Sequence, residues 1–96
     1  MATIMTMRTP GGPQLYDRVN EEMDADNNPP DGLIHHFAAT DGDEMILFDV
    51  WESQEAFERF QKERVMPAVV KVMGDQLPPE GAPQPTFAKL HHELHR

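Results

Sequence analysis

Two adjacent histidines, His35 and His36, lie in the segment 33–40, which predicts a strand. Side chains alternate along a strand, so we expect His36 on the face of Ile34 and Ala38, with His35 on the opposite face. An imidazole titrates near neutral pH, so His36 can serve as a base toward the acidic proton of a phenol or anthrone, or bind a carbonyl oxygen. The alternative is a core histidine satisfied by a neighbouring carboxylate.

Asp49 and Trp51 lie two residues apart on one face of a further predicted strand. A buried carboxylate needs a partner, and Arg64 is the candidate, because helical spacing places it on the apolar side of its helix beside Phe57 and Phe60. Two roles follow for Arg64. It pairs with an acid such as Asp49 as a structural contact, which we favour, or it holds an anionic group of a ligand.

Aromatic and sulfur-containing side chains supply the remaining pocket candidates. Trp51 is most simply a core or interface residue, although it can also stack on a flat ring, and Tyr16 lies at the edge of a helical apolar stripe. Seven methionines would give a pocket an adaptable lining, but they are also ordinary core filling.

The C-terminal run His91-His92-Glu93-Leu94-His95 invites comparison with a zinc motif. The metalloprotease motif needs Glu directly after the first His and a second His four residues along a helix, and here His95 comes too early. In a strand, His91, Glu93 and His95 would share a face and could bind a stray metal ion. A solvated terminal edge is the simpler interpretation, so we assign no metal.

Composition bounds the class of protein. Ninety-six residues suit a single domain over 1–96, and most of the nine prolines cluster between the predicted elements. Eight basic against 17 acidic residues give a net charge of −9, which argues against nucleic-acid and membrane-surface binding. The chain has no cysteine, and we find neither a signal peptide nor a membrane-spanning stretch, so we expect a cytoplasmic protein.

Periodicity and turn residues give the order of elements. Strands are expected over 2–8, 33–40, 44–51 and 86–94, with an Asp41-Gly42 turn between the second and third. One helix starts at Pro13, and another is capped by Ser53, broken near Pro67 and ended by Gly74. This βαββαβ order predicts an α+β ferredoxin-like fold, a four-stranded antiparallel sheet with both helices on one face. Apolar residues on both faces of the third strand indicate that a second subunit covers the open face.

The segments 30–38 and 49–53, with Phe57, Phe60, Glu63-Arg64 and Pro67, resemble the dimeric α/β-barrel superfamily, small bacterial proteins related to antibiotic biosynthesis monooxygenases. The resemblance implies that two ferredoxin-like subunits join their sheets into a barrel, with a ligand cleft between sheet and helices. Members include cofactor-free oxygenases of polycyclic aromatic ketones, haem-degrading enzymes, isomerases and decarboxylase-like proteins. The better-studied oxygenases place an asparagine and a tryptophan at the cleft, whereas here no predicted strand holds an asparagine.

Our leading hypothesis is a homodimer that binds a small aromatic or polyketide-like molecule and performs cofactor-independent oxygenation or proton transfer. His36 is the candidate base, and Trp51, Arg64, Asp49 and Tyr16 are the candidate binding residues. No cofactor is assigned. The rival hypothesis is a non-catalytic binding or assembly module, and haem binding is disfavoured by the shortage of basic residues for propionates.

Overall fold

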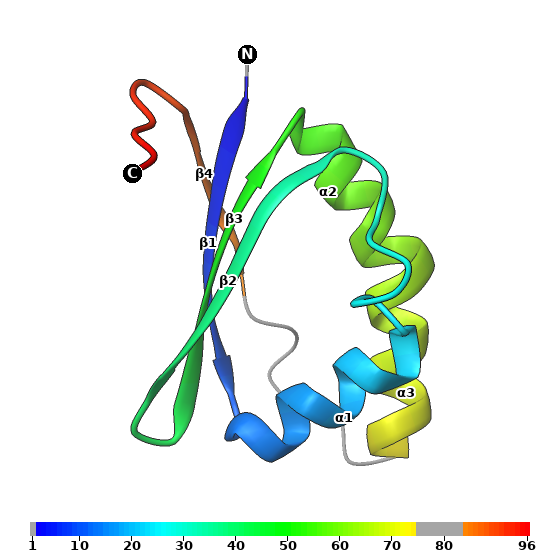
Figure 1. Ribbon diagram of the computed structural model, residues 1–96. Helices are drawn as coiled ribbons and strands as arrows, with labels where there is room; N and C mark the ends of the chain where they lie inside the picture. Colours follow the sequence, from blue (N-terminus) through cyan, green and yellow to red (C-terminus); the bar gives the residue numbers. More distant parts are fainter. Residues whose placement is uncertain (1, 75–83) are drawn as a thin grey trace.

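A computed structural model describes residues 2–74 and 84–96, and in it one sheet is covered on one face by helices (Figure 1). The strands lie in the order β2-β3-β1-β4, and every neighbouring pair is antiparallel, which confirms the α+β ferredoxin-like fold. The elements are β1 (Thr3–Pro10), α1 (Pro13–Met23), β2 (Leu33–Asp41), β3 (Glu44–Trp51), α2 (Gln54–Phe60), a π-helix (Gln61–Val65), α3 (Met66–Met73) and β4 (Thr86–Lys89). No helix within the described ranges is long and apolar enough to cross a bilayer.

The core lies where the sheet meets α2. Met5 and Trp51 are 1% exposed, and they pack with Ala56 and Phe57 from the helix. The Trp51 and Phe57 rings meet edge to face, with centroids 5.7 Å apart, a favourable geometry for aromatic pairs. Trp51 therefore fixes the end of β3 against α2.

A β-bulge in β2 changes which residues share a face. Leu33 pairs with Trp51 and His35 with Val50, so Ile34 is an extra residue without a partner of its own. The expected pairing of His36 with Ile34 on one face is therefore wrong: His36 shares the helix-facing side with Leu33, and Ile34 is exposed. The bulge leaves the other expectation intact, because His35 and His36 still point to opposite faces.

The predicted break before Pro67 takes the form of a π-helix. Ser53 caps α2 as expected, accepting a hydrogen bond from the Ala56 N–H at 3.1 Å. Pro67 has no N–H to donate to the turn before it, and the wider turns of Gln61–Val65 accommodate its ring. The chain then continues as α3 and ends at Gly74, whose φ of 59° favours glycine.

The last strand is shorter than expected. We predicted a strand over 86–94, but β4 ends at Lys89, and residues 90–96 have no regular structure. Its partner strand is the reason: Lys89 pairs with Thr3, the first residue of β1, and Leu90 adds one bond to the Ala2 carbonyl. Most of the proline-rich connection before β4 lies outside the described residues.

Gly32 brings the loop after α1 against the start of α2. Its φ is 88°, and an added Cβ would lie 2.7 Å from the Ala56 Cβ. Its carbonyl accepts the Glu52 N–H at 2.7 Å. Only glycine satisfies both the backbone angle and this close approach, so Gly32 sets the entry of β2 relative to α2.

Candidate functional site

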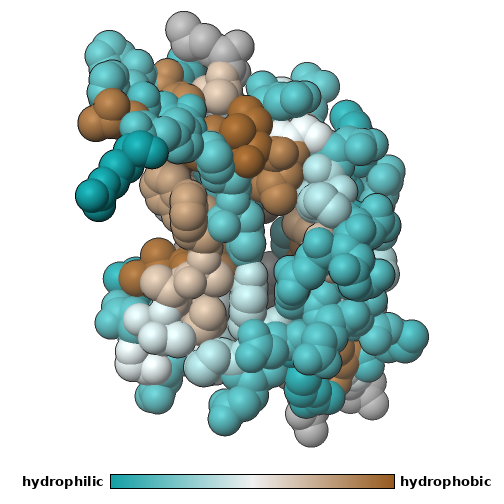
Figure 2. Space-filling model, viewed as in Figure 1, coloured by the Kyte–Doolittle hydropathy of each residue, from teal (hydrophilic) through white to brown (hydrophobic). Residues whose placement is uncertain are grey.

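A cavity of about 590 Å³ lies between the helix-facing side of the sheet and the helices. In Figure 2 it is the hollow between the sheet and the helical layer. All six methionines in the described ranges line it: Met5, Met7, Met23, Met45, Met66 and Met73. Thioether side chains are unbranched and polarisable, so this wall can adapt to ligands of different outline.

A chain of four hydrogen-bonded side chains runs along the sheet wall of this cavity. The Tyr16 hydroxyl lies 2.5 Å from His36 Nε2, and His36 Nδ1 lies 2.5 Å from Asp49 Oδ1. The Trp51 indole N–H donates to Asp49 Oδ2 at 3.0 Å. The four residues come from α1, β2 and β3, and Asp49 pairs directly with His36 in the β2–β3 ladder.

The position of each proton follows from the acceptors. Asp49 is 3% exposed, and its carboxylate can only accept, so the N–H of His36 is on Nδ1. A neutral imidazole then has its free lone pair on Nε2, which accepts the Tyr16 O–H. The Trp51 N–H satisfies the second carboxylate oxygen, and among the described side chains no buried polar atom lacks a partner. Tyr16 therefore donates to His36, and His36 donates to Asp49.

Burial raises the pKa of the Tyr16 phenol above its ordinary 10.0, and the negative charges of Asp49, Asp26 and Asp17 raise it further. The phenol therefore stays protonated and acts as a donor to His36. Tyr16 is the chain's only tyrosine and Trp51 its only tryptophan, so each gives a spectroscopic signal from this site alone.

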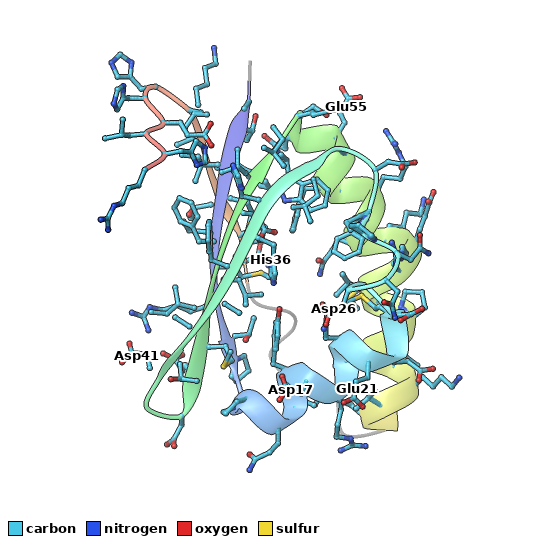
Figure 3. The ribbon with its side chains drawn as sticks, viewed as in Figure 1. Asp17, Glu21, Asp26, His36, Asp41 and Glu55 are labelled. Carbon is cyan, nitrogen blue, oxygen red and sulfur yellow. The ribbon has the colours of Figure 1, made fainter. Side chains whose placement is uncertain are left out.

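The helical wall adds polar groups of its own. Figure 3 shows His36 and Asp26 pointing into the space between sheet and helices from opposite sides. Asp26, in the loop after α1, accepts from the Asn20 amide at 3.2 Å, and Asn20 and Gln61 also line the cavity. The sequence did not predict these three polar residues as part of the site, because nothing in their spacing distinguishes them from ordinary surface positions.

The partner that we expected for Arg64 was wrong, because Arg64 does not pair with Asp49, although its contact is a structural one as we favoured. Its guanidinium donates to the Met23 carbonyl at the end of α1 at 2.9 Å and lies 5.5 Å from the Phe60 ring centroid. Asp49 is satisfied by His36 and Trp51 instead. Arg64 is also absent from the cavity lining, so it joins the π-helix to α1.

The other four candidates all line the cavity. They form the hydrogen-bond chain in the order Tyr16, His36, Asp49 and Trp51. The sequence predicted these residues near a pocket, and one interpretation paired His36 with a neighbouring carboxylate, but it did not identify that carboxylate as Asp49. The available signal was the shared face of Asp49 and Trp51, together with the predicted hairpin, which brings β2 beside β3.

No protein-family profile matches the sequence, and no curated protein matches it either. Solved structures do. A candidate antibiotic biosynthesis monooxygenase from Chloroflexus aurantiacus superposes with a TM-score of 0.63 at 14% identity, covering 99% of this chain and 98% of that one. The chain has the fold of the antibiotic biosynthesis monooxygenases.

Two Streptomyces proteins extend the comparison. SnoaB, a cofactor-independent oxygenase from Streptomyces nogalater, gives a TM-score of 0.61 at 15% identity and covers 99% of this chain and 97% of its own. The ActVA-Orf6 monooxygenase of Streptomyces coelicolor, solved with the ligand nanaomycin D, gives 0.60 at 14% identity, with 99% and 92% covered. At these identities the likeness establishes the fold.

Proposed function

We propose that this protein binds a small, flat, largely apolar molecule in the cavity and removes a proton from it, as a cofactor-independent monooxygenase of an aromatic or polyketide-like substrate. The observation that carries the proposal is the Tyr16–His36–Asp49 chain, which opens onto an apolar cavity of about 590 Å³. A volume of this order suits a ligand of several fused rings. The oxygenases with the same fold support it as neighbours.

The hydrogen-bond chain gives the proton a route. A substrate oxygen or carbon acid that meets the Tyr16 hydroxyl can transfer its proton to that oxygen while the phenolic proton moves to His36 Nε2. The imidazolium that forms is stabilised by the Asp49 carboxylate on Nδ1, and the Trp51 N–H holds the other carboxylate oxygen. The phenol need not ionise in the resting protein, which agrees with its raised pKa.

Molecular oxygen, O₂, is the oxidant. Removal of the proton leaves an electron-rich carbanion or phenolate, which can transfer electrons to O₂ directly. In the overall reaction a ring CH₂ and O₂ become a ring C=O and water, and His36 returns its proton to the departing oxygen. The protein contributes the base, the orientation of the ring and the exclusion of bulk water.

The test uses dithranol, a hydroxylated anthrone. Binding under nitrogen is followed by quenching of Trp51 fluorescence, and turnover is followed by O₂ uptake. Glutamine in place of His36 keeps a hydrogen-bonding side chain but accepts no proton, so His36→Gln should lower turnover by about 10²- to 10⁴-fold while binding changes little. His92→Gln, an exposed histidine in the C-terminal segment, is the matched control and should leave both measurements unchanged. Equal turnover by His36→Gln and the control would remove His36 from the chemistry.

One observation favours a binding protein without catalysis. Every polar atom of the four-residue chain already has a partner, so the chain can also serve as a fixed, polar wall that orients a ligand. This second candidate predicts that dithranol quenches Trp51 while O₂ uptake stays at the rate measured in buffer. The same pair of measurements therefore separates the two functions.

We also propose that the sheet face away from the helices associates with a second copy of the chain. Phe37 and Phe48 are paired across β2 and β3, and alternation directs them away from the cavity. They are 59% and 37% exposed, with ring centroids 6.2 Å apart. Such adjacent aromatic rings are typical of an interface. Light scattering should report a dimer, and Phe37→Asp should shift it toward the monomer; a monomeric wild-type protein contradicts the proposal.

A further inference from the structure

Two histidines and a glutamate converge on the sheet face opposite the cavity. His35 comes from β2, whereas Glu93 and His95 come from the C-terminal segment, residues 90–96. Glu93 Oε2 lies 2.7 Å from His35 Nε2 and 2.6 Å from His95 Nε2. The two imidazole rings lie 5.2 Å apart between centroids, tilted by 43°. Residues 58 positions apart in the chain therefore direct their ligand atoms at one point.

The donor set is the one that transition metals select. Two imidazole nitrogens and one carboxylate oxygen bind Zn²⁺ and similar divalent ions, with metal–ligand distances of about 2.0–2.2 Å. One ligand atom of each residue lies within 4.8 Å of the others, so small side-chain rotations bring all three to a common ion. In the present arrangement both Nε2 atoms donate protons to the same oxygen, and a divalent ion would replace both protons.

A metal ion at this site would attach the C-terminal segment to the sheet. Leu94 is 84% exposed, so apolar packing of this side chain does not hold the segment in place. Within the described residues, the segment is joined to the rest of the chain by the Leu90 N–H to Ala2 carbonyl bond at its start and by the Glu93–His35 contact near its end. A bound ion would fasten residues 90–96 to β2 through His35.

We propose that His35, Glu93 and His95 form a binding site for a divalent transition-metal ion of the Zn²⁺ class. The side chains are 32%, 34% and 67% exposed, so water can complete the coordination. The site is separate from the cavity, because His35 and His36 lie on opposite faces of the sheet. The sequence led us to assign no metal to the run 91–95, and the site proposed here differs from the strand-face set considered there, because His35 of β2 takes the place of His91.

Calorimetric titration of the full chain, without a histidine tag, with Zn²⁺ in a non-chelating buffer tests the site. We expect saturation at one ion per chain, reversed by a chelator. His35→Gln, Glu93→Gln and His95→Gln should each weaken binding about tenfold or more. His92→Gln is the matched control, since it removes a histidine from the same segment outside the cluster, and it should leave the affinity unchanged.

The fold of each variant is checked independently by Trp51 fluorescence, since Trp51 is buried on the other face. Co²⁺ absorption provides a second measurement, because its intensity reports the coordination geometry and should change in the His35→Gln variant but not in the control. The proposal is wrong if Zn²⁺ binding does not saturate, or if His92→Gln weakens it as much as His35→Gln does. The second outcome would mean that the histidine-rich segment chelates metal without β2.

Discussion

Asp49→Asn is the sharpest perturbation of the hydrogen-bond chain, because it changes one atom of a side chain that is 3% exposed. The carboxylate accepts from both His36 Nδ1 and Trp51 Nε1. An asparagine has one acceptor oxygen and one amide NH₂, so it can satisfy only one of these donors. If its oxygen accepts from Trp51, the NH₂ group faces His36 Nδ1 and forces that nitrogen to become an acceptor.

The magnitude follows from the lost bond. A hydrogen bond to a charged group contributes about 1.5–3 kcal/mol to stability, and Asp49→Asn replaces such a bond to His36 by a neutral one. We therefore expect Asp49→Asn to lower the free energy of unfolding by about 2–3 kcal/mol, or on the order of 30- to 150-fold in the unfolding equilibrium. The tautomer change also moves the imidazole proton to Nε2, so this nitrogen can no longer accept a proton from Tyr16 and turnover should fall together with stability.

Urea unfolding followed by Trp51 fluorescence measures the stability, and nitrogen NMR of the histidine ring measures the tautomer. Asp41→Asn is the matched control: Asp41 pairs with Arg8 at 2.8 Å, but both side chains are more than half exposed, so the loss should stay below about 1 kcal/mol. The reasoning is refuted if the two variants lose equal stability, or if His36 keeps its Nδ1 proton in Asp49→Asn.

Two further predictions follow from single positions. Gly32→Ala should destabilise the protein by about 2–3 kcal/mol, because it adds a clash with Ala56 to the strain of a positive φ. Gly42→Ala is the control: an added Cβ there meets nothing within 4 Å, so the loss should be only about 1 kcal/mol. Equal losses of stability in thermal unfolding would exclude the clash. The absorbance titration of Tyr16 should have its midpoint above 10.0, and a midpoint at or below it would contradict the burial of the phenol. Because the pKa of Tyr16 is higher in the folded protein, its contribution to stability is complete below pH 10.0 and is lost as the pH rises through the folded pKa. Tyr16→Phe should therefore make the alkaline loss of stability smaller.

The sequence by itself determined the order of the elements and most of their ends. Pro13, Ser53 and Gly74 act through backbone angles and caps within a few residues, so their effects are readable from the local sequence. The Asp41-Gly42 turn likewise fixed the β2–β3 hairpin, and with it the antiparallel arrangement of His36 beside Asp49.

The tertiary structure decided the partners. One extra residue at Ile34 shifted the alternation that a regular strand would have, and only pairing with β3 reveals such a bulge. Arg64 turned to the end of α1 because the packing of the helices, which periodicity does not specify, placed the Met23 carbonyl within its reach. The contacts of Tyr16 with His36 and of His35 with Glu93 were unpredictable for the same reason. Each contact joins side chains 20 or more residues apart, so its geometry depends on how whole elements pack.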